Sequence, residues 1–352
     1  MEIKVLKIRL GLKNPFRIAH GSYAYRESIL VWLRVGGAFG MGEAPIVPYY
    51  GVSADEVEED LRRGLRSGAA DAALSDPGFP SGDFAYPVSR CAFQTAVLSL
   101  RGRLEGIGLP EVLGFYGERK TPPSSFTVAY DDDPEEMVRV AAASGFRHLK
   151  VKAGIPGDIE RLRLLRERLP HATIRVDANQ GWSMEEAPGK LAELERIGVE
   201  LVEEPVAGGP ADFERLASST SLPILLDESA KDLEQVRRFG REAPSVAGIV
   251  VKTAKNGGPC ASALLARAAV DSGLRVMVSC MVESSLGVSA ALALAPLCTW
   301  CDLDAPLLLS EDPFSGLTYE EEVPRVGPSG VVPGPALAEH IEGLPPLQGE
   351  AR

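Results

Sequence analysis

Charged residues recur in this chain at the ends of short apolar runs, at nearly constant intervals. Lys152, Asp177, Glu203, Asp227 and Lys252 follow one another at separations of 25, 26, 24 and 25 residues. One carboxylate on each of three neighbouring strands offers a hard divalent cation oxygen ligands from separate rigid elements. Without a cation, three such charges would repel one another. The spacing therefore predicts a metal site, with Mg²⁺ as the expected ion and Mn²⁺ as a substitute, because the set contains no thiolate or imidazole.

Lysine is scarce in this sequence, yet it is placed at these strand ends. The chain has 10 Lys against 27 Arg, and four of the ten are Lys150, Lys152, Lys252 and Lys255. Lysine can lose its proton and act as a base, whereas arginine stays charged. We expect Lys150 and the nearby cation to lower the pKa of Lys152, and we expect Lys255 to be a loop residue.

These groups match the removal of a proton next to a carboxylate. In this chemistry the metal holds the carboxylate and stabilises an enediolate, one lysine removes the proton, and the other returns a proton on the opposite face. The two bases would be Lys152 and Lys252.

The common interval reflects eight β-rich runs that alternate with helical segments. The runs are 126–129, 148–152, 173–177, 200–203, 223–227, 248–252, 275–279 and 299–304, and helices are expected at 134–144, 158–168, 184–196 and 259–272. Eight such units predict an α/β chain with a (β/α)8 TIM-type barrel, whose chemistry lies at the carboxyl ends of the strands. A doubly wound open sheet is the main alternative. In a ring of eight, the second and sixth strands place Lys152 opposite Lys252.

The first 120 residues have a different texture. An alternating run at 2–10 and a β-rich run at 28–35 predict strands, and Ser53 can cap a helix that begins at Ala54. A second helix is expected at 89–104, and the stretch 120–124 is the expected boundary. We predict an α+β domain at 1–120, the barrel at 121–308 and a C-terminal segment at 309–352.

Composition excludes several classes of protein. The net charge is −12, with 49 acidic against 37 basic residues, so a nucleic-acid partner is not expected. The least polar stretch, 287–300, is too short to cross a membrane and contains Pro296. The five cysteines include one C-x-x-C, Cys298-Thr299-Trp300-Cys301, whose apolar context is unlike a zinc knuckle. The N-terminal residues lack the apolar core of a signal peptide. We therefore expect reduced thiols in a cytoplasmic protein, and we expect a homo-oligomer.

Five motifs resemble those of the enolase superfamily, within its muconate-lactonizing subgroup. They are Lys150-Val151-Lys152, Arg175-Val176-Asp177-Ala178-Asn179-Gln180-Gly181-Trp182, Val202-Glu203-Glu204-Pro205, Leu226-Asp227-Glu228-Ser229 and Val251-Lys252. The pairing of a lysine base with Mg²⁺ is typical of that superfamily. The resemblance implies that Asp177, Glu203 and Asp227 bind the metal and that Lys152 and Lys252 are the acid/base pair. It also implies that the N-terminal domain is a capping domain and that the C-terminal segment returns to it.

Within the subgroup, the end of the eighth strand suggests the substrate. Asp302-Leu303-Asp304 resembles the D-x-D element with which dipeptide epimerases bind the α-ammonium group of their substrate, and alternation places both carboxylates on one face. The same resemblance implies that the substrate site also includes Thr127, Lys150, Cys280, Met281 and Val282. It implies an epimerase that inverts the α-carbon of the C-terminal residue of a dipeptide by transfer of a proton between the two lysines. The roles of Glu204, Glu228 and Glu283 stay open, with metal contact or a lysine pair as the options for the first two.

One departure affects specificity. Epimerases for Ala-Glu carry an arginine in the N-terminal loop, where this chain has Gly21, so an apolar or other side chain is at least as consistent with the sequence as an acidic one. Arg17, His20 and Arg26 are alternative contacts that the sequence cannot orient. Two other functions remain open: an o-succinylbenzoate synthase or other muconate-lactonizing-type lyase or cycloisomerase, which needs one lysine base, and a non-catalytic binding barrel, which would not use two opposed lysines.

Overall fold

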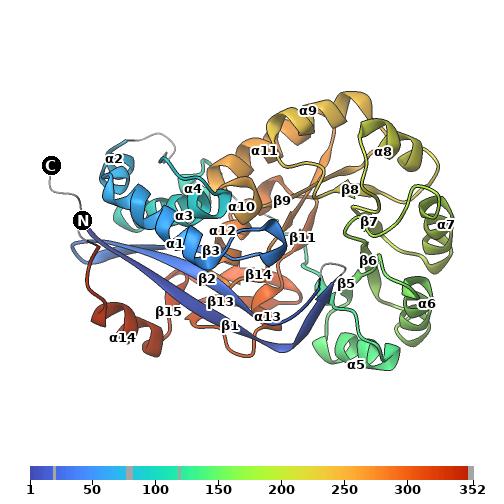
Figure 1. The fold of residues 1–352 in the computed structure, drawn as a ribbon, viewed down its shortest axis with the longest axis horizontal. Coiled ribbons are helices and arrows are strands. Elements are labelled where there is room, and N and C mark those ends of the chain that lie inside the picture. The colour runs from blue at the N-terminus through green and yellow to red at the C-terminus, as the bar shows by residue number, and fades with distance from the viewer. Residues whose placement is uncertain (19–20, 77–81, 118–119, 348–352) are drawn as a thin grey trace.

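A computed structural model describes residues 1–18, 21–76, 82–117 and 120–347 of the chain. Figure 1 shows a long antiparallel sheet with helices α1–α3 on one side of the molecule and a curved array of strands and outer helices on the other. The second region is the predicted barrel. The predicted fold class is confirmed.

Eight parallel strands form the barrel, as the sequence predicts. They are β4 (Phe126–Val128), β5 (His148–Lys152), β6 (Thr173–Asp177), β7 (Leu201–Glu203), β8 (Ile224–Leu226), β9 (Gly248–Lys252), β10 (Arg275–Ser279) and β11 (Trp300–Asp302). They are hydrogen-bonded in sequence order from β4 to β11. A parallel bridge between Ser124 and Cys301 joins the two end strands, and the Ser125 N–H donates to the Cys301 carbonyl at 3.2 Å. The sheet is thereby nearly closed into a ring, which excludes the open doubly wound alternative.

Helices connect the strands (Figure 1). They are α5 (Pro134–Ser144), α6 (Asp158–Arg168), α7 (Ala187–Ile197), α8 (Pro210–Ala217), α9 (Leu233–Glu242), α10 (Thr253–Asn256), α11 (Pro259–Asp271), α12 (Ser285–Leu292), the 3-10 turn η2 (Ala295–Leu297) and α13 (Ala305–Leu308). Of these, α5–α9 and α11 cover the outside of the ring, whereas α10, α12 and α13 contact elements of the cap (Figure 1). Local sequence sets the ends of α5, since the Asp133 side chain caps its first turn and Gly145 ends it in the left-handed conformation. The predicted bounds of α5 and α6 are confirmed, and α7 begins three residues later than predicted, because 184–186 form the turn before it.

Strand alternation gives the barrel an apolar layer below its polar one. Five buried side chains form a cluster inside the ring: Leu201, Leu225, Val250, Met277 and Trp300. Each lies two residues before a polar residue of the same strand or strand end. Because side chains two apart on a strand share a face, those polar residues also point into the ring. The apolar layer thus closes the barrel beneath its charged residues.

The N-terminal region forms the cap. Its elements are β1 (Glu2–Ile18), β2 (Gly21–Val35), β3 (Ala38–Pro45), the 3-10 turn η1 (Pro48–Tyr50), α1 (Ala54–Arg66), α2 (Ala69–Ser75), α3 (Pro87–Glu105) and α4 (Leu109–Val112). The predicted capping of α1 is confirmed, because Ser53 and Glu56 form a reciprocal capping box. Gly40 and Gly42 allow α3 to pack closely on β3, since a Cβ at Gly42 would lie 1.9 Å from the Ala92 carbonyl oxygen.

The C-terminal segment returns to the cap. It contains β12 (Phe314–Ser315), β13 (Leu317–Glu320), β14 (Val323–Val326), β15 (Val332–Pro333) and α14 (Pro335–Gly343). The buried Lys4 ammonium of β1 donates to the Ile341 carbonyl at 2.8 Å, and the Leu347 N–H donates to the Ile3 carbonyl at 2.7 Å. The domain boundaries at 120 and 308 stay predictions. No helix within the described ranges is both long enough and apolar enough to cross a membrane.

Candidate active site

The predicted acid/base lysines and metal ligands lie together at the carboxyl ends of the barrel strands. Lys152 of β5 is paired in register with Asp177 of β6, which is paired with Glu203 of β7. Asp227 directly follows β8, and Lys252 ends β9. β5 and β9 are four strands apart in the order of eight, so the two lysines approach the centre of the ring from opposite sides.

Each of the two predicted bases holds an ion pair with a predicted metal ligand. The Lys152 ammonium lies 2.6 Å from Asp177 Oδ2, and the Lys252 ammonium lies 2.5 Å from Asp227 Oδ2. Burial acts to lower the pKa of Lys252, but the charges of Asp227 and Glu203 outweigh it and hold that pKa well above its usual value. In this arrangement the carboxylates keep Lys252 protonated.

Lys150 is an ion-pair partner of three acids. Its ammonium lies 2.8 Å from Glu203 Oε2, 2.8 Å from Asp302 Oδ2 and 3.3 Å from Asp177 Oδ2. Burial opposes the charged form, yet the charges of Asp302 and Glu203 raise the pKa of Lys150 well above its usual value. Lys150 therefore carries a fixed positive charge at the centre of the acidic cluster.

Among the three predicted metal ligands, Glu203 has carboxylate oxygens that are free of hydrogen bonds from the described residues. Glu203 is fully buried, and neither of its carboxylate oxygens has a hydrogen-bond partner among the described residues. Its contact with Lys150 is an ion pair without hydrogen-bond geometry. Burial, followed by the charge of Asp177, raises the pKa of Glu203 to about 8. Both oxygens of this buried carboxylate therefore lack hydrogen-bond donors within the described ranges, which fits a ligand for a divalent cation.

The side chains are not arranged around a metal in this conformation. Within the described part of the chain, no group of three or more His, Cys, Asp or Glu side chains is close enough to hold a metal ion. The ammonium groups of Lys150, Lys152 and Lys252 lie against these carboxylates instead. The donor set of Asp177, Glu203 and Asp227 fits Mg²⁺ chemically, and holding the ion requires these ion pairs to rearrange.

Glu204 and Glu228 have roles that the sequence left open. The Glu204 carboxylate accepts hydrogen bonds from the Asp227 N–H at 2.6 Å, from Gln180 Nε2 at 2.9 Å and from the Ser229 hydroxyl. It thus holds the backbone of Asp227. Glu228 accepts a hydrogen bond from Asn179 Nδ2 at 3.1 Å, and burial together with the charge of Asp227 raises its pKa to about 7.

Backbone strain marks the same strand ends. Asn179, Gln180 and Glu204 have φ values of 44°, 62° and 41°, in the left-handed region that residues other than glycine rarely adopt. Such strain costs free energy and persists where surrounding contacts enforce it, often at functional sites. Here the Gln180 N–H donates to the Glu204 carbonyl at 2.8 Å, which links the two strained turns.

Lys255 corrects a prediction. It is not a loop residue but lies on the one-turn helix α10, where it is buried. Its ammonium donates to Asp227 Oδ1 at 2.5 Å and to the carbonyls of Asp227 and Val250 at 2.8 and 3.0 Å. The Gly-Gly that follows Asn256 favoured a loop, but a spacing of three from Lys252 also suits one helical turn. Asp227 is consequently held by two lysines.

Every residue predicted for catalysis or substrate binding lines one cavity at the barrel mouth. The barrel strands and the segments that follow them contribute Thr127, Lys150, Lys152, Asn179, Lys252, Cys280, Met281, Val282, Asp302, Asp304, Ala305 and Leu308, and the cap contributes Phe16, Arg26 and Val47. The cap residues Phe16 and Val47 were missed, because no pattern in a single sequence links the cap to the barrel. Among the alternative contacts, Arg26 lies in this wall, while His20 lies outside the described residues.

The two aspartates at the end of β11, Asp302 and Asp304, are not equivalent. Asp302 accepts hydrogen bonds from Lys150 at 2.8 Å, from the Ser279 hydroxyl at 2.9 Å and from the Ser125 hydroxyl at 2.7 Å. Asp304 accepts only from Thr127, through its N–H and its hydroxyl, among the described residues. Burial and the charge of Asp302 raise the pKa of Asp304 to about 7. Asp304 is therefore the aspartate with capacity for a further cation.

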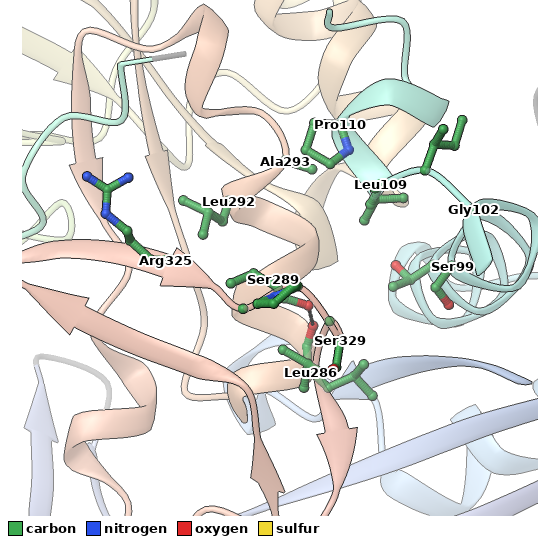
Figure 2. A pocket seen from close by; sticks show the side chains of 18 of the residues that line it. Ser99, Gly102, Leu109, Pro110, Leu286, Ser289, Leu292, Ala293, Arg325 and Ser329 are labelled. Carbon is green, nitrogen blue, oxygen red and sulfur yellow. Dashed lines mark hydrogen bonds between the residues drawn. The ribbon is translucent and has the colours of Figure 1, made fainter. Parts of the chain in front are cut away.

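A larger cavity lies elsewhere in the described part of the chain. Figure 2 shows it between the end of α3, α4, the outer face of α12 and the segment that carries Arg325 and Ser329. It contains none of the strand-end acids or lysines. Because the opposed lysines Lys152 and Lys252 and the perturbed acid Asp304 line the cavity in the barrel mouth, we assign the candidate active site there.

Comparisons with known proteins show the family of the chain. The family model described as "Enolase C-terminal domain-like" matches residues 132–324. The L-Ala-D/L-amino acid epimerase of Maribacter sp. is 30% identical over 340 residues, which cover 94% of this chain and 99% of that protein.

Two solved structures are similar in both fold and sequence. The substrate-liganded complex of the L-Ala-D/L-Glu epimerase from Bacillus subtilis has a TM-score of 0.83 at 30% identity and covers 95% of this chain and 98% of that chain. The dipeptide epimerase from Cytophaga hutchinsonii, complexed with Mg and the dipeptide D-Ala-L-Val, has a TM-score of 0.80 at 25% identity and covers 98% and 99%. The chain is an enzyme of the isomerase class, and it belongs to the enolase superfamily.

Proposed function

We propose that this enzyme is a Mg²⁺-dependent dipeptide epimerase that inverts the α-carbon of the C-terminal residue of its substrate. One observation carries the proposal: Lys152 and Lys252, from strands four apart in the ring, line a single cavity that also holds Asp304. Two opposed bases are what a 1,1-proton transfer requires, because inversion removes a proton from one face of a carbon and adds one to the other. The similarity to epimerases supports this proposal.

The lysines would act as a pair. In one direction Lys152 removes the α-proton as the neutral amine while Lys252, as the ammonium, donates a proton to the opposite face, and in the reverse direction the roles exchange. Each must leave its present ion pair, with Asp177 or with Asp227, to reach a substrate atom. The apolar layer inside the ring closes the barrel beneath both lysines, so a substrate would reach them from the barrel mouth.

Asp177, Glu203 and Asp227 would hold the metal, as Mg²⁺ or Mn²⁺. When bound, the ion would supply positive charge to offset the negative charge that develops on the substrate carboxylate as the α-proton leaves. The relative from Cytophaga hutchinsonii was crystallised with Mg, which supports the choice of ion. Glu204 holds the Asp227 backbone and so would fix the third ligand.

Asp304 would bind the α-ammonium group of the dipeptide, and Thr127 fixes its carboxylate. Asp302 would contribute to substrate binding through Lys150, whose ammonium already donates a hydrogen bond to one of its carboxylate oxygens. An anionic succinylbenzoate precursor would meet the Asp304 charge, which disfavours the synthase alternative. The cytoplasmic location and the homo-oligomer stay predictions.

Incubation with Mg²⁺ and a dipeptide library in D₂O, followed by mass spectrometry, tests the function. Epimerisation adds one deuteron at the α-carbon of the C-terminal residue of the substrates. If no dipeptide exchanges while a succinylbenzoate precursor is dehydrated, the enzyme is the synthase and the proposal is wrong.

A further inference from the structure

Two buried acids at the contact between the cap and the barrel take no part in the chemistry described above. Glu43 lies on β3 of the cap and Glu283 lies in the turn after β10, and each is 1% exposed. Burying two carboxyl groups side by side is costly, and the charge of Glu43 adds to the effect of burial in raising the pKa of Glu283 well above its usual value. Both carboxyl groups bind the backbone of the segment 281–287.

Glu43 reaches from the cap to the first turn of a barrel helix. Its carboxylate accepts hydrogen bonds from the Ser284 hydroxyl, from the Ser284 N–H at 3.2 Å and from the Gly287 N–H at 3.3 Å. Ser284 is the N-cap residue of α12. The first N–H groups of a helix lack partners within it and favour negative charge, so Glu43 caps α12 from another domain. The Ser28 hydroxyl, which donates to Glu43 at 2.7 Å, orients the carboxylate.

Glu283 holds the segment just before that helix. Its Oε1 accepts a hydrogen bond from the Met281 N–H at 3.2 Å, while its Oε2 is buried without a partner among the described residues. The carboxyl group fits against Gly287, where an added Cβ would lie 2.2 Å from Oε2. Residues 280–282, which this contact fixes, line the substrate cavity.

We infer that Glu43 and Glu283 are positioning residues that set the 280–282 wall of the substrate cavity relative to the cap. Neither lines the cavity. The cap residues Phe16, Arg26 and Val47 form part of the same cavity, so a single hydrogen-bonded connection from β3 to α12 fixes the width between its cap wall and its β10 wall. The inference rests on the proposed function only in that the cavity receives the dipeptide.

The variant Glu43→Gln tests it. The amide keeps one acceptor oxygen and replaces the other with an NH₂ group that cannot accept. Either the donors of Ser28 and Ser284 at Oε1 or those of Ser284 and Gly287 at Oε2 therefore lose their acceptor. We expect KM for a dipeptide to rise about tenfold, with kcat changed by less than about twofold, since one net hydrogen bond is lost from positioning and none from the chemistry. Hydrogen–deuterium exchange of the 280–287 segment should become faster.

A pair of variants at Glu283 separates positioning from folding. Glu283→Gln keeps an oxygen that can accept from the Met281 N–H, whereas Glu283→Leu does not. We therefore expect Glu283→Leu to raise KM as Glu43→Gln does, and Glu283→Gln to recover most of that loss. If a Glu43 variant fails to fold, Gly287→Ala, whose Cβ displaces the Glu283 carboxyl, should raise KM in its place.

Lys4→Met is the matched control. It breaks a buried contact between the cap and α14, through Ile341, without touching 280–287. It should lower the melting temperature and leave KM and the exchange of 280–287 unchanged. The inference is overturned if Glu43→Gln and Lys4→Met have the same KM, or if Glu43→Gln leaves exchange of that segment unchanged. Because the exchange measurement needs no substrate, it decides the matter even if no dipeptide is epimerised.

Discussion

The two walls of the substrate cavity are built in different ways. The barrel wall consists of residues at successive strand ends, held in register by the sheet and tied together by ion pairs such as those of Lys150. The cap wall consists of Phe16, Arg26 and Val47, which come from β1, from β2 and from beyond β3. Phe16 also follows an irregularity in the pairing of β1 with β2. Under the proposed function, the barrel wall would carry the reaction and the cap wall would carry the choice of substrate.

The largest loss is expected from the barrel lysines. Lys152→Ala and Lys252→Ala should each lower epimerisation by about 10³-fold or more, because each removes one general acid/base group. Each variant should still exchange the α-proton of one stereoisomer with solvent, through the lysine that remains. NMR in D₂O measures exchange separately for the two isomers. Equal loss of exchange for both isomers in either variant would contradict the two-base mechanism.

Removal of the metal should have an effect of similar size. A chelator should lower kcat/KM by about 10³-fold, and added Mg²⁺ should restore it, since the charge on the substrate carboxylate would otherwise be unbalanced. Glu203→Gln should resist this restoration because the amide is a weaker ligand. The control is Glu320→Gln, a surface acid that pairs with Arg325 far from the site. Full activity in the presence of the chelator would refute the metal assignment.

Within the barrel wall, Asp304→Asn should have an intermediate effect on kcat/KM. We expect KM to rise about 100-fold, because the substrate ammonium loses a buried charged partner. The pKa of Asp304 is raised to about 7, so the ionised form that accepts an ammonium is present above that pH and is lost below it. In the wild type kcat/KM should therefore fall by about tenfold per pH unit below pH 7, as a pH profile measures. Asp304→Asn should lack this fall, and a profile that keeps it would assign it to another group.

The smallest effects are expected in the cap wall. Val47→Ala removes apolar contact with the substrate and should raise KM by about threefold to tenfold. The ranking of dipeptides should change while kcat for the preferred one stays within about twofold. Competition of a dipeptide mixture, followed by mass spectrometry, measures that ranking. If Val47→Ala lowers kcat as strongly as a lysine variant, the division of labour between the walls is wrong.

This difference also explains how much the sequence could predict. In the barrel, strand alternation and a period near 25 residues predict the positions of Lys152, Asp177 and Lys252, because local geometry sets where those side chains point. The sites of Glu204 and Lys255 were not predicted: Glu204 depends on a strained turn, and Lys255 on a single helical turn beside Gly-Gly. Phe16 and Val47 depend on how two domains dock, for which a single sequence carries no local pattern.

The lysine and acid cluster has a consequence for charge balance. Four ammonium groups, of Lys150, Lys152, Lys252 and Lys255, contact four carboxylates, of Asp177, Glu203, Asp227 and Asp302. With all eight ionised, their charges cancel. A divalent cation would add two positive charges, of which the substrate carboxylate would neutralise one. The loss of one lysine proton would neutralise the other, so this set of charges would cancel when one lysine is an amine and its opposite is still an ammonium.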